Sequence, residues 1–380
     1  MEEFNILVID DDSQQKKLLE EAISEINEES DLLFKFEMAD NPEKAMLELY
    51  KNNYQAIIID LNLKSTDANI KDEEISGNIL LNQIIDKEII PTIIRTGFPE
   101  KISERINKNI VEVCTKDDPP LYDIILKLKE KYNESIFKIF GSKGKINKNL
   151  KELFWEIMPK CFLENKVEIT KLDNDKKEKV LIRYISSWLT NKYMFNEKYE
   201  DVEPIEMYMF PNPIEQVCTC DIFKNNDSKN IYLVLTPSCD LANKKTDEVL
   251  LCKIQDYKDI IGFNELLGNY KNETSKLSKK AKKAKEGLEK WFRNSHQDSM
   301  RYHFLPKVSF FKGGLIDFRS LKCVKYNKEN GKLEDEKFEK IGVITEAFKR
   351  DIIARFSSYY HRQGQPEFNG ESILKNIEED

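Results

Sequence analysis

The chain has 380 residues, of which 40% are hydrophobic and 34% are charged, and its formal net charge is −8. This length suggests two or three domains, and the acidic balance gives no general argument for nucleic-acid binding. No apolar stretch reaches the roughly 18 residues of a membrane span, and the N-terminus lacks the pattern of a signal peptide. We therefore expect a cytoplasmic protein whose seven cysteines are reduced thiols.

The first third of the chain alternates strand and helix patterns. Four apolar runs have the length and Val/Ile content of buried strands: NILVIDDD (5–12), QAIIIDL (55–61), TIIRTG (92–97) and VEVCTK (111–116). A further strand is predicted near 32–38, and helices are predicted after Ser13, from Pro42, near 78–86, near 100–109 and over 121–132. Five such units predict a flavodoxin-like α/β fold, a doubly wound five-stranded parallel sheet of order 2-1-3-4-5.

Polar residues end four of these strands. They are Asp10 with Asp11, then Asp60, Thr96 and Lys116. Because the carboxyl ends of parallel strands share one edge, and ligands bind at that edge, we expect three carboxylates, a hydroxyl and an ammonium to converge on one crevice. An ordinary doubly wound domain with chance polar strand ends is the alternative.

This ordered set resembles the receiver domain of bacterial response regulators in two-component systems. The resemblance covers residues 1–132 and implies that Asp60 is the phosphoacceptor, a nucleophile that forms an aspartyl phosphate. Mg²⁺ would offset the mutual repulsion of the carboxylates, with Asp10 or Asp11 and Asp60 as ligands. Lys116 would contact phosphoryl oxygens, and Thr96 would move toward the phosphate and act as a switch.

The chain departs from the receiver pattern at three places. Asp117 follows Lys116 where the family has proline, and Val113 stands where the family has an aromatic switch residue. The segment 64–76 is longer and more acidic than the usual loop, and it is expected to be a solvated surface loop. These departures keep a second hypothesis open, in which the domain is a pseudo-receiver scaffold that takes no phosphate.

Residues 133–200 are predicted to be a helical connector. GSKGK (141–145) marks a flexible break, and 150–163 and 180–195 have amphipathic helical patterns. The aromatic residues of these segments are expected to lie in a core, because large aromatics dominate interior packing; they are Phe154, Trp155, Trp188 and Tyr193. The charged stretch 172–179 is expected to be an exposed loop, and the helical pair is a candidate homodimer contact.

Residues 201–365 are predicted to form a β-rich output domain, followed by a tail at 366–380. Short apolar runs separated by turn sequences indicate a small barrel or sandwich; they are IEMYMF (205–210), CDIF (220–223), IYLVLTP (231–237), EVLLCKI (248–254), KVSFF (307–311) and GLIDFRSLKCVKY (314–326). A helix is predicted over 346–360.

The order of these runs resembles the SH3-like barrel of MazF/PemK toxins. The resemblance rests on CDIF, on 232–254 and on 341–356, and it implies ribonuclease chemistry as a third hypothesis, an RNA-cleaving effector. The family's nucleolytic arginine lies just before the second strand, where this chain has NNDSKN (225–230). The whole architecture also resembles receiver-containing proteins of bacterial anti-phage conflict systems.

Three further features of the output domain have two interpretations each. Ser238, Cys239 and Asp240 follow a buried strand and are a candidate nucleophilic site, although a structural turn is favoured. Four cysteines are interpreted as buried thiols rather than zinc ligands, since one C-x-C lacks paired spacing; they are Cys218, Cys220, Cys239 and Cys252. The basic helix 275–293 could contact phosphates through its lysines, but a solvated helical face is the favoured interpretation.

The leading hypothesis is a phosphorylation-controlled regulator rather than an enzyme. The receiver would catalyse at most its own phosphoryl transfer. The resemblance implies a histidine kinase or a GHKL-type ATPase as the partner, and an effector protein as a possible downstream contact. No helix-turn-helix pattern is present, so the β-rich region rather than a DNA-binding helix would deliver the output.

Overall fold

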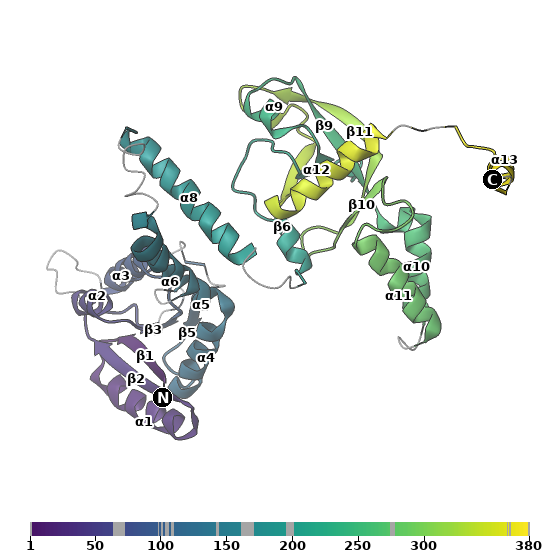
Figure 1. Ribbon diagram of the computed structural model, residues 1–380. Helices are drawn as coiled ribbons and strands as arrows, with labels where there is room; N and C mark the ends of the chain where they lie inside the picture. Colours follow the sequence, from purple (N-terminus) through teal and green to yellow (C-terminus); the bar gives the residue numbers. More distant parts are fainter. Residues whose placement is uncertain are drawn as a thin grey trace. The chain divides into compact units, whose positions relative to one another are not determined.

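The chain folds into two compact units, residues 1–197 and 198–380. The computed structural model describes residues 2–63, 73–97, 99, 102, 106–107, 110–141, 144–160, 171–194, 201–273, 278–362, 364 and 366–378 (Figure 1). The predicted insertion at 64–76 and the predicted helix at 100–109 lie mostly outside these residues. None of the described helices is long and apolar enough to cross a membrane.

The N-terminal unit contains a five-stranded parallel sheet of order β2-β1-β3-β4-β5, as the sequence predicted. Its strands are β1 (Glu2–Ile9), β2 (Leu32–Ala39), β3 (Ala56–Ile59), β4 (Thr92–Arg95) and β5 (Glu112–Cys114). Each neighbouring pair is parallel, and Ile9 of β1 lies opposite Ile59 of β3. Consecutive strands of the chain therefore end at the same edge of the sheet.

Helices cover both faces of this sheet. Ile6 and Val8 pack with α1 (Ser13–Glu29) and α4 (Leu121–Asn133) in one core cluster. Leu7 and Ile9 pack with α2 (Pro42–Lys51) and α3 (Glu73–Lys87) in another. Because successive side chains of β1 point to opposite faces and both faces are buried near the carboxyl edge, the strand is apolar from Ile6 to Ile9.

Two predictions for the connector were wrong. Phe154 and Trp155 are 59% and 73% exposed and pack on each other instead of in a core. The charged stretch predicted to be a loop is helical from Asn174, the first residue of α8 (Asn174–Met194). Lysine and glutamate are good helix formers, and Asp173 Oδ1 accepts a hydrogen bond from Lys176 N at 2.8 Å, as a helix cap does.

The other helical elements of the connector are short. It contains α5 (Ser135–Phe140), α6 (Lys145–Glu152) and a π-helical turn, η2 (Leu153–Ile157). α8, described over its full length, has no buried residue, so it does not supply the packing partner that Phe154 and Trp155 would need in a core.

The C-terminal unit contains an eight-stranded antiparallel sheet of order β10-β11-β9-β8-β7-β13-β6, with β12 paired to β11. The strands are β6 (Tyr208–Met209), β7 (Asp221–Asn225), β8 (Ile231–Val234), β9 (Glu248–Gln255), β10 (Tyr302–Leu305), β11 (Gly314–Asn327), β12 (Lys332–Leu333) and β13 (Phe338–Ile344). This sheet confirms a β-rich unit, whereas the MazF/PemK barrel assignment stays a prediction.

The helices of this unit are partly as predicted. The helix predicted over 346–360 is α12 (Glu346–His361), and the predicted basic helix is α11 (Lys279–Phe292). Ala281 and Leu288 of α11 are buried while its lysines are exposed, and α11 lies beside α10 (Ile261–Asn272), which the sequence analysis missed (Figure 1). The remaining elements are η4 (Pro204–Met207), α9 (Ser238–Ala242), η5 (Tyr257–Asp259) and α13 (Gly370–Glu378).

One predicted strand, KVSFF, is a loop. Phe311 is buried in the core of the unit, and Val308 N donates to the Phe311 carbonyl across a turn instead of pairing with a strand. An apolar run of five residues can fill a core without pairing, and this explains why its composition was misleading.

Two histidines of the C-terminal unit are buried in neutral form. His296 stacks on Trp291 with 3.5 Å between ring centroids, and neither of its ring nitrogens has a hydrogen-bond partner among the described residues. Burial lowers the pKa of His296 to about 4 and that of His303 to about 3. In the unfolded chain both would titrate near pH 6.5. Between that pH and the lower pKa values of the folded state, the folded chain therefore binds fewer protons than the unfolded chain.

We predict that acid destabilises this unit. The contribution of these neutral histidines to the free energy of unfolding is fully present above pH 6.5 and is lost as the pH drops toward 4. The expected loss between pH 7 and pH 5 is roughly 2 kcal/mol for each histidine. His296→Phe keeps the ring stack and removes one titrating group, so denaturant unfolding of the full chain should lose less stability over this interval. The exposed His361→Gln is the control. An unchanged pH slope in His296→Phe would contradict the assignment.

Candidate functional site

Two buried carboxylates lie side by side at the carboxyl edge of the parallel sheet. Asp10 follows β1 and Asp60 follows β3, and their side chains are almost fully enclosed. Asp60 N donates to the Ile9 carbonyl at 2.8 Å, which continues the β1–β3 pairing to the site itself. The sheet register therefore fixes the two carboxylates next to each other.

Lys116 contacts both carboxylates from two residues beyond β5. Its Nζ lies 2.6 Å from Asp60 Oδ2 and 3.4 Å from Asp10 Oδ2. Burial alone would lower the pKa of Lys116, but the hydrogen bond to Asp60 and the charges of both carboxylates outweigh it, so the pKa is raised. Lys116 is thus a cation at neutral pH, and it partly compensates two negative charges.

The other oxygen of each carboxylate accepts a backbone hydrogen bond. Asp12 N donates to Asp10 Oδ1 at 2.9 Å, and Asn62 N donates to Asp60 Oδ1 at 3.1 Å. Burial nevertheless raises the pKa of Asp10, and the nearby Asp60 acts in the same direction against the effects of Lys116 and Asp12. Asp10 therefore carries its charge at a cost that a second cation would relieve.

The remaining predicted residues lie at the same edge. Thr96 is buried directly after β4, and its backbone N donates to the Cys114 carbonyl at 3.1 Å. Asp11 is half-buried beside Asp10, in the turn that leads into α1. The structure thus brings Asp10, Asp60 and Lys116 into direct contact and places Thr96 and Asp11 around them.

Arg95 is a residue of this site that the sequence analysis did not single out. It is the last residue of β4 and is 6% exposed. Arg95 Nη2 donates to the Lys116 carbonyl, and Nη1 donates to Gln15 Oε1 of α1 at 2.6 Å. These bonds tie the backbone of Lys116 to two other elements. The sequence did contain a signal for Arg95, because a charged residue ends an otherwise apolar buried strand and a buried charge requires specific partners.

The donor set suits a hard divalent cation. Within the described residues no group of three or more His, Cys, Asp or Glu side chains is arranged to hold a metal. Mg²⁺, however, is commonly held by one or two carboxylates plus water and phosphate oxygens, and this site offers two adjacent buried carboxylates with a single ammonium between them. Asp10 and Asp60 fit such a cation, with Asp11 next to them.

The second candidate site, in the C-terminal unit, is not assembled as a nucleophile with a base. Ser238, Cys239 and Asp240 begin the short helix α9, and Cys239 is exposed. Cys239 Sγ lies 3.6 Å from Asp240 Oδ1, and among the described residues it contacts no histidine. The candidate role of these residues stays a prediction.

The cysteine interpretation holds for two positions and fails for one. Cys220 and Cys252 are buried, and burial raises the pKa of Cys220 to about 12. Cys218 is half-buried, whereas Cys239 is exposed and not a core thiol, because α9 presents it at the surface.

Neither a known protein family nor a curated protein matches this sequence. Many solved structures are similar to its first third, and they include receiver domains from several bacteria. A CheY-like receiver from Methylobacillus flagellatus is 15% identical, with 33% of this chain and 98% of that chain covered and a TM-score of 0.26. TrrA of Thermotoga maritima, solved with Mg²⁺-BeF, is 22% identical, with 34% and 98% covered and a TM-score of 0.26.

A signal receiver domain from Vibrio parahaemolyticus is 19% identical, with 36% of this chain and 97% of that chain covered and a TM-score of 0.27. The strand order β2-β1-β3-β4-β5 and the helices on both faces independently make this unit a flavodoxin-like α/β fold.

Asp10→Asn should weaken Mg²⁺ binding without weakening the metal-free fold. The amide keeps an oxygen that accepts from Asp12 N, and it removes a buried negative charge. Because the pKa of Asp10 is raised in the folded state, its ionisation lowers the stability of the fold as pH rises. The asparagine side chain does not ionise, so the variant avoids this loss. We expect at least a tenfold loss of Mg²⁺ affinity, measured by calorimetric titration of the full chain, and equal or higher apo stability at pH 7. Exposed Asp31→Asn is the control. Unchanged affinity with reduced apo stability would contradict the prediction.

Proposed function

We propose that residues 1–132 are a phosphorylation-controlled receiver whose phosphoacceptor is Asp60. The observation that carries this proposal is the contact of Lys116 Nζ with both Asp60 and Asp10 at the carboxyl edge of a 2-1-3-4-5 sheet. A carboxylate can attack a phosphoryl group to give an acyl phosphate. Asp60 ends the central strand of the sheet and faces the other charged groups of the site.

Each residue of the site has a role in this reaction. Asp60 Oδ2 supplies the nucleophile, and Lys116 stabilises the negative charge on the phosphoryl oxygens. Thr96 supplies a hydroxyl for a phosphoryl oxygen, and Arg95 is a positioning residue that holds Lys116 through its carbonyl. Mg²⁺, held by Asp10 and Asp60 with Asp11 nearby, would neutralise carboxylate and phosphoryl charge when bound.

The phosphodonor in this proposal is a histidine kinase or a related ATPase. The output passes to the C-terminal unit, because the chain leads from α4 through α5, α6 and α8 into residues 198–380. Val113 lacks a ring that could rotate between exposed and buried positions, so the aromatic switch of other receivers is absent at that position. We therefore assign the relay to α4 and the connector helices.

Phosphoryl mimicry tests the acceptor. The full chain with Mg²⁺ and beryllofluoride should bind one adduct, observed by fluorine NMR, and Asp60→Asn should abolish it because the amide oxygen is a poor nucleophile and ligand. Asp86→Asn, on α3, should retain the adduct. An equally strong adduct on Asp60→Asn would overturn the assignment, and no adduct on the unmodified chain would favour the pseudo-receiver scaffold.

Hydrogen exchange tests the relay. Beryllofluoride should change exchange at residues 96–97 and in the described parts of 121–160, because the phosphoryl group shifts the equilibrium only through contacts that differ between the two states. The Asp60→Asn chain should show no change under the same conditions. Changes confined to residues 60–80 would place the exit of the signal in the insertion instead.

A further inference from the structure

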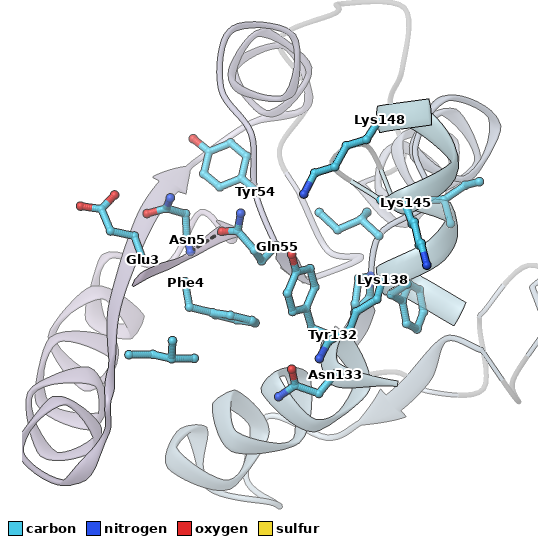
Figure 2. Close-up of a pocket in the computed structure, with 17 residues that line it drawn as sticks. Glu3, Phe4, Asn5, Tyr54, Gln55, Tyr132, Asn133, Lys138, Lys145 and Lys148 are labelled. Atoms are coloured by element: carbon cyan, nitrogen blue, oxygen red, sulfur yellow. Dashed lines mark hydrogen bonds between the residues drawn. The ribbon is translucent and has the colours of Figure 1, made fainter. Parts of the chain in front are cut away.

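A cavity of about 710 Å³ lies at the amino edge of the parallel sheet, away from the acidic site (Figure 2). Its walls come from the start of β1, from residues that precede β3 and β4, and from α4, α5 and α6. Strands rise about 3.3 Å per residue, so Asn5 in this cavity lies roughly 16 Å along β1 from Asp10. This is the size of a small-molecule site, and the proposed receiver chemistry does not use it.

The charged side chains that line the cavity are mainly cationic. Lys138, Lys145 and Lys148 line it, and Figure 2 shows the Lys148 ammonium directed toward Gln55. Among the described residues, neither Lys138 nor Lys148 forms an ion pair. The one acidic residue of the lining, Glu3, is paired with Lys35 outside it. The field in the cavity therefore favours an anion.

The side chain of Gln55 offers one hydrogen-bond donor to this cavity. Gln55 is 7% exposed, and its Oε1 accepts a hydrogen bond from Asn5 N at 2.6 Å. Its Nε2 has no partner within the described part of the chain and borders the cavity. This nitrogen is therefore free to donate a hydrogen bond to a ligand oxygen in the cavity.

The N-terminus of α6 adds partial positive charge to the same cavity. Its cap residue, Gly144, is buried, lines the cavity and provides no side-chain cap. A Cβ at Gly144 would overlap the Ile139 carbonyl, so the backbone approach requires glycine. Uncapped first-turn N–H groups attract phosphate oxygens.

Aromatic side chains complete the lining. Tyr54 and Tyr132 border the cavity, and the Tyr132 ring meets Phe4 edge-on with 5.4 Å between centroids. We propose that this cavity binds a nucleotide, with its phosphates at Lys138, Lys148 and the α6 N-terminus and its base against the tyrosines. Gln55 Nε2 donates to an oxygen of the ligand.

The cavity also touches the connector. Lys145 Nζ lies 5.2 Å from the centroid of the Tyr193 ring, and Lys192 Nζ lies 2.5 Å from Glu152 Oε2. Asn149 donates to the Tyr193 hydroxyl. Since these pairs join α6 to the end of α8, a nucleotide held by α6 contacts the segment that leads to the C-terminal unit.

Calorimetric titration of the full chain tests this proposal, with ATP, AMP and pyrophosphate as probes. ATP or AMP should bind at least tenfold more tightly than pyrophosphate. Gln55→Glu keeps the acceptor for Asn5 N and replaces the donor by a negative charge, so it should weaken nucleotide binding at least tenfold. Lys138→Ala with Lys148→Ala should do the same, whereas exposed Lys151→Ala on the same helix should not.

Three results would overturn the nucleotide site: no binding of any probe, equal binding of pyrophosphate, or binding that Gln55→Glu and the double lysine variant leave unchanged. Asp60→Asn should bind the nucleotide as the unmodified chain does. Nucleotide binding in a chain that forms no beryllofluoride adduct would therefore separate failure of the proposed receiver function from failure of this site.

Discussion

The charge balance among Asp10, Asp60 and Lys116 is the constraint on which the candidate site depends. Two ionised carboxylates buried side by side repel each other unless a cation compensates them, and the ammonium of Lys116 compensates part of that charge. The β1–β3 register brings the acids together, and β5 and the Arg95 contact with the Lys116 carbonyl position the cation. The strand order therefore creates the site. One ammonium does not neutralise two carboxylates, and the remaining negative charge favours the binding of a further cation.

The sequence predicted the N-terminal sheet well because its inner strands, β1, β3 and β4, are buried on both faces where they approach the site. Such strands are continuous apolar runs, and the residue at which each run ends reveals the functional edge. Arg95 was missed because its partners, Gln15 and the Lys116 carbonyl, are distant in sequence. Phe154 and Trp155 were assigned to a core because composition shows that a side chain is apolar but not whether another element covers it.

The two edges of the parallel sheet have opposite chemistry. The carboxyl edge concentrates acids around one lysine, and the amino edge has a cavity lined by three lysines and an uncapped helix N-terminus. Each edge is connected to the helices that follow the sheet in the chain. α4, which follows Lys116, packs against the sheet, and α6, which borders the cavity, contacts the end of α8. The arrangement allows two anionic signals to act on one connector, each through its own contacts.

Chemical trapping tests the central claim, that Asp60 is a phosphoacceptor, most directly. The full chain is incubated with Mg²⁺ and a small phosphodonor, and the product is reduced with borohydride, which converts an aspartyl phosphate to homoserine. The account predicts homoserine at position 60, found by peptide mass mapping, and its absence when Mg²⁺ is removed. An unmodified Asp60 in the presence of Mg²⁺, or homoserine at Asp10 or Asp11 instead, would contradict it.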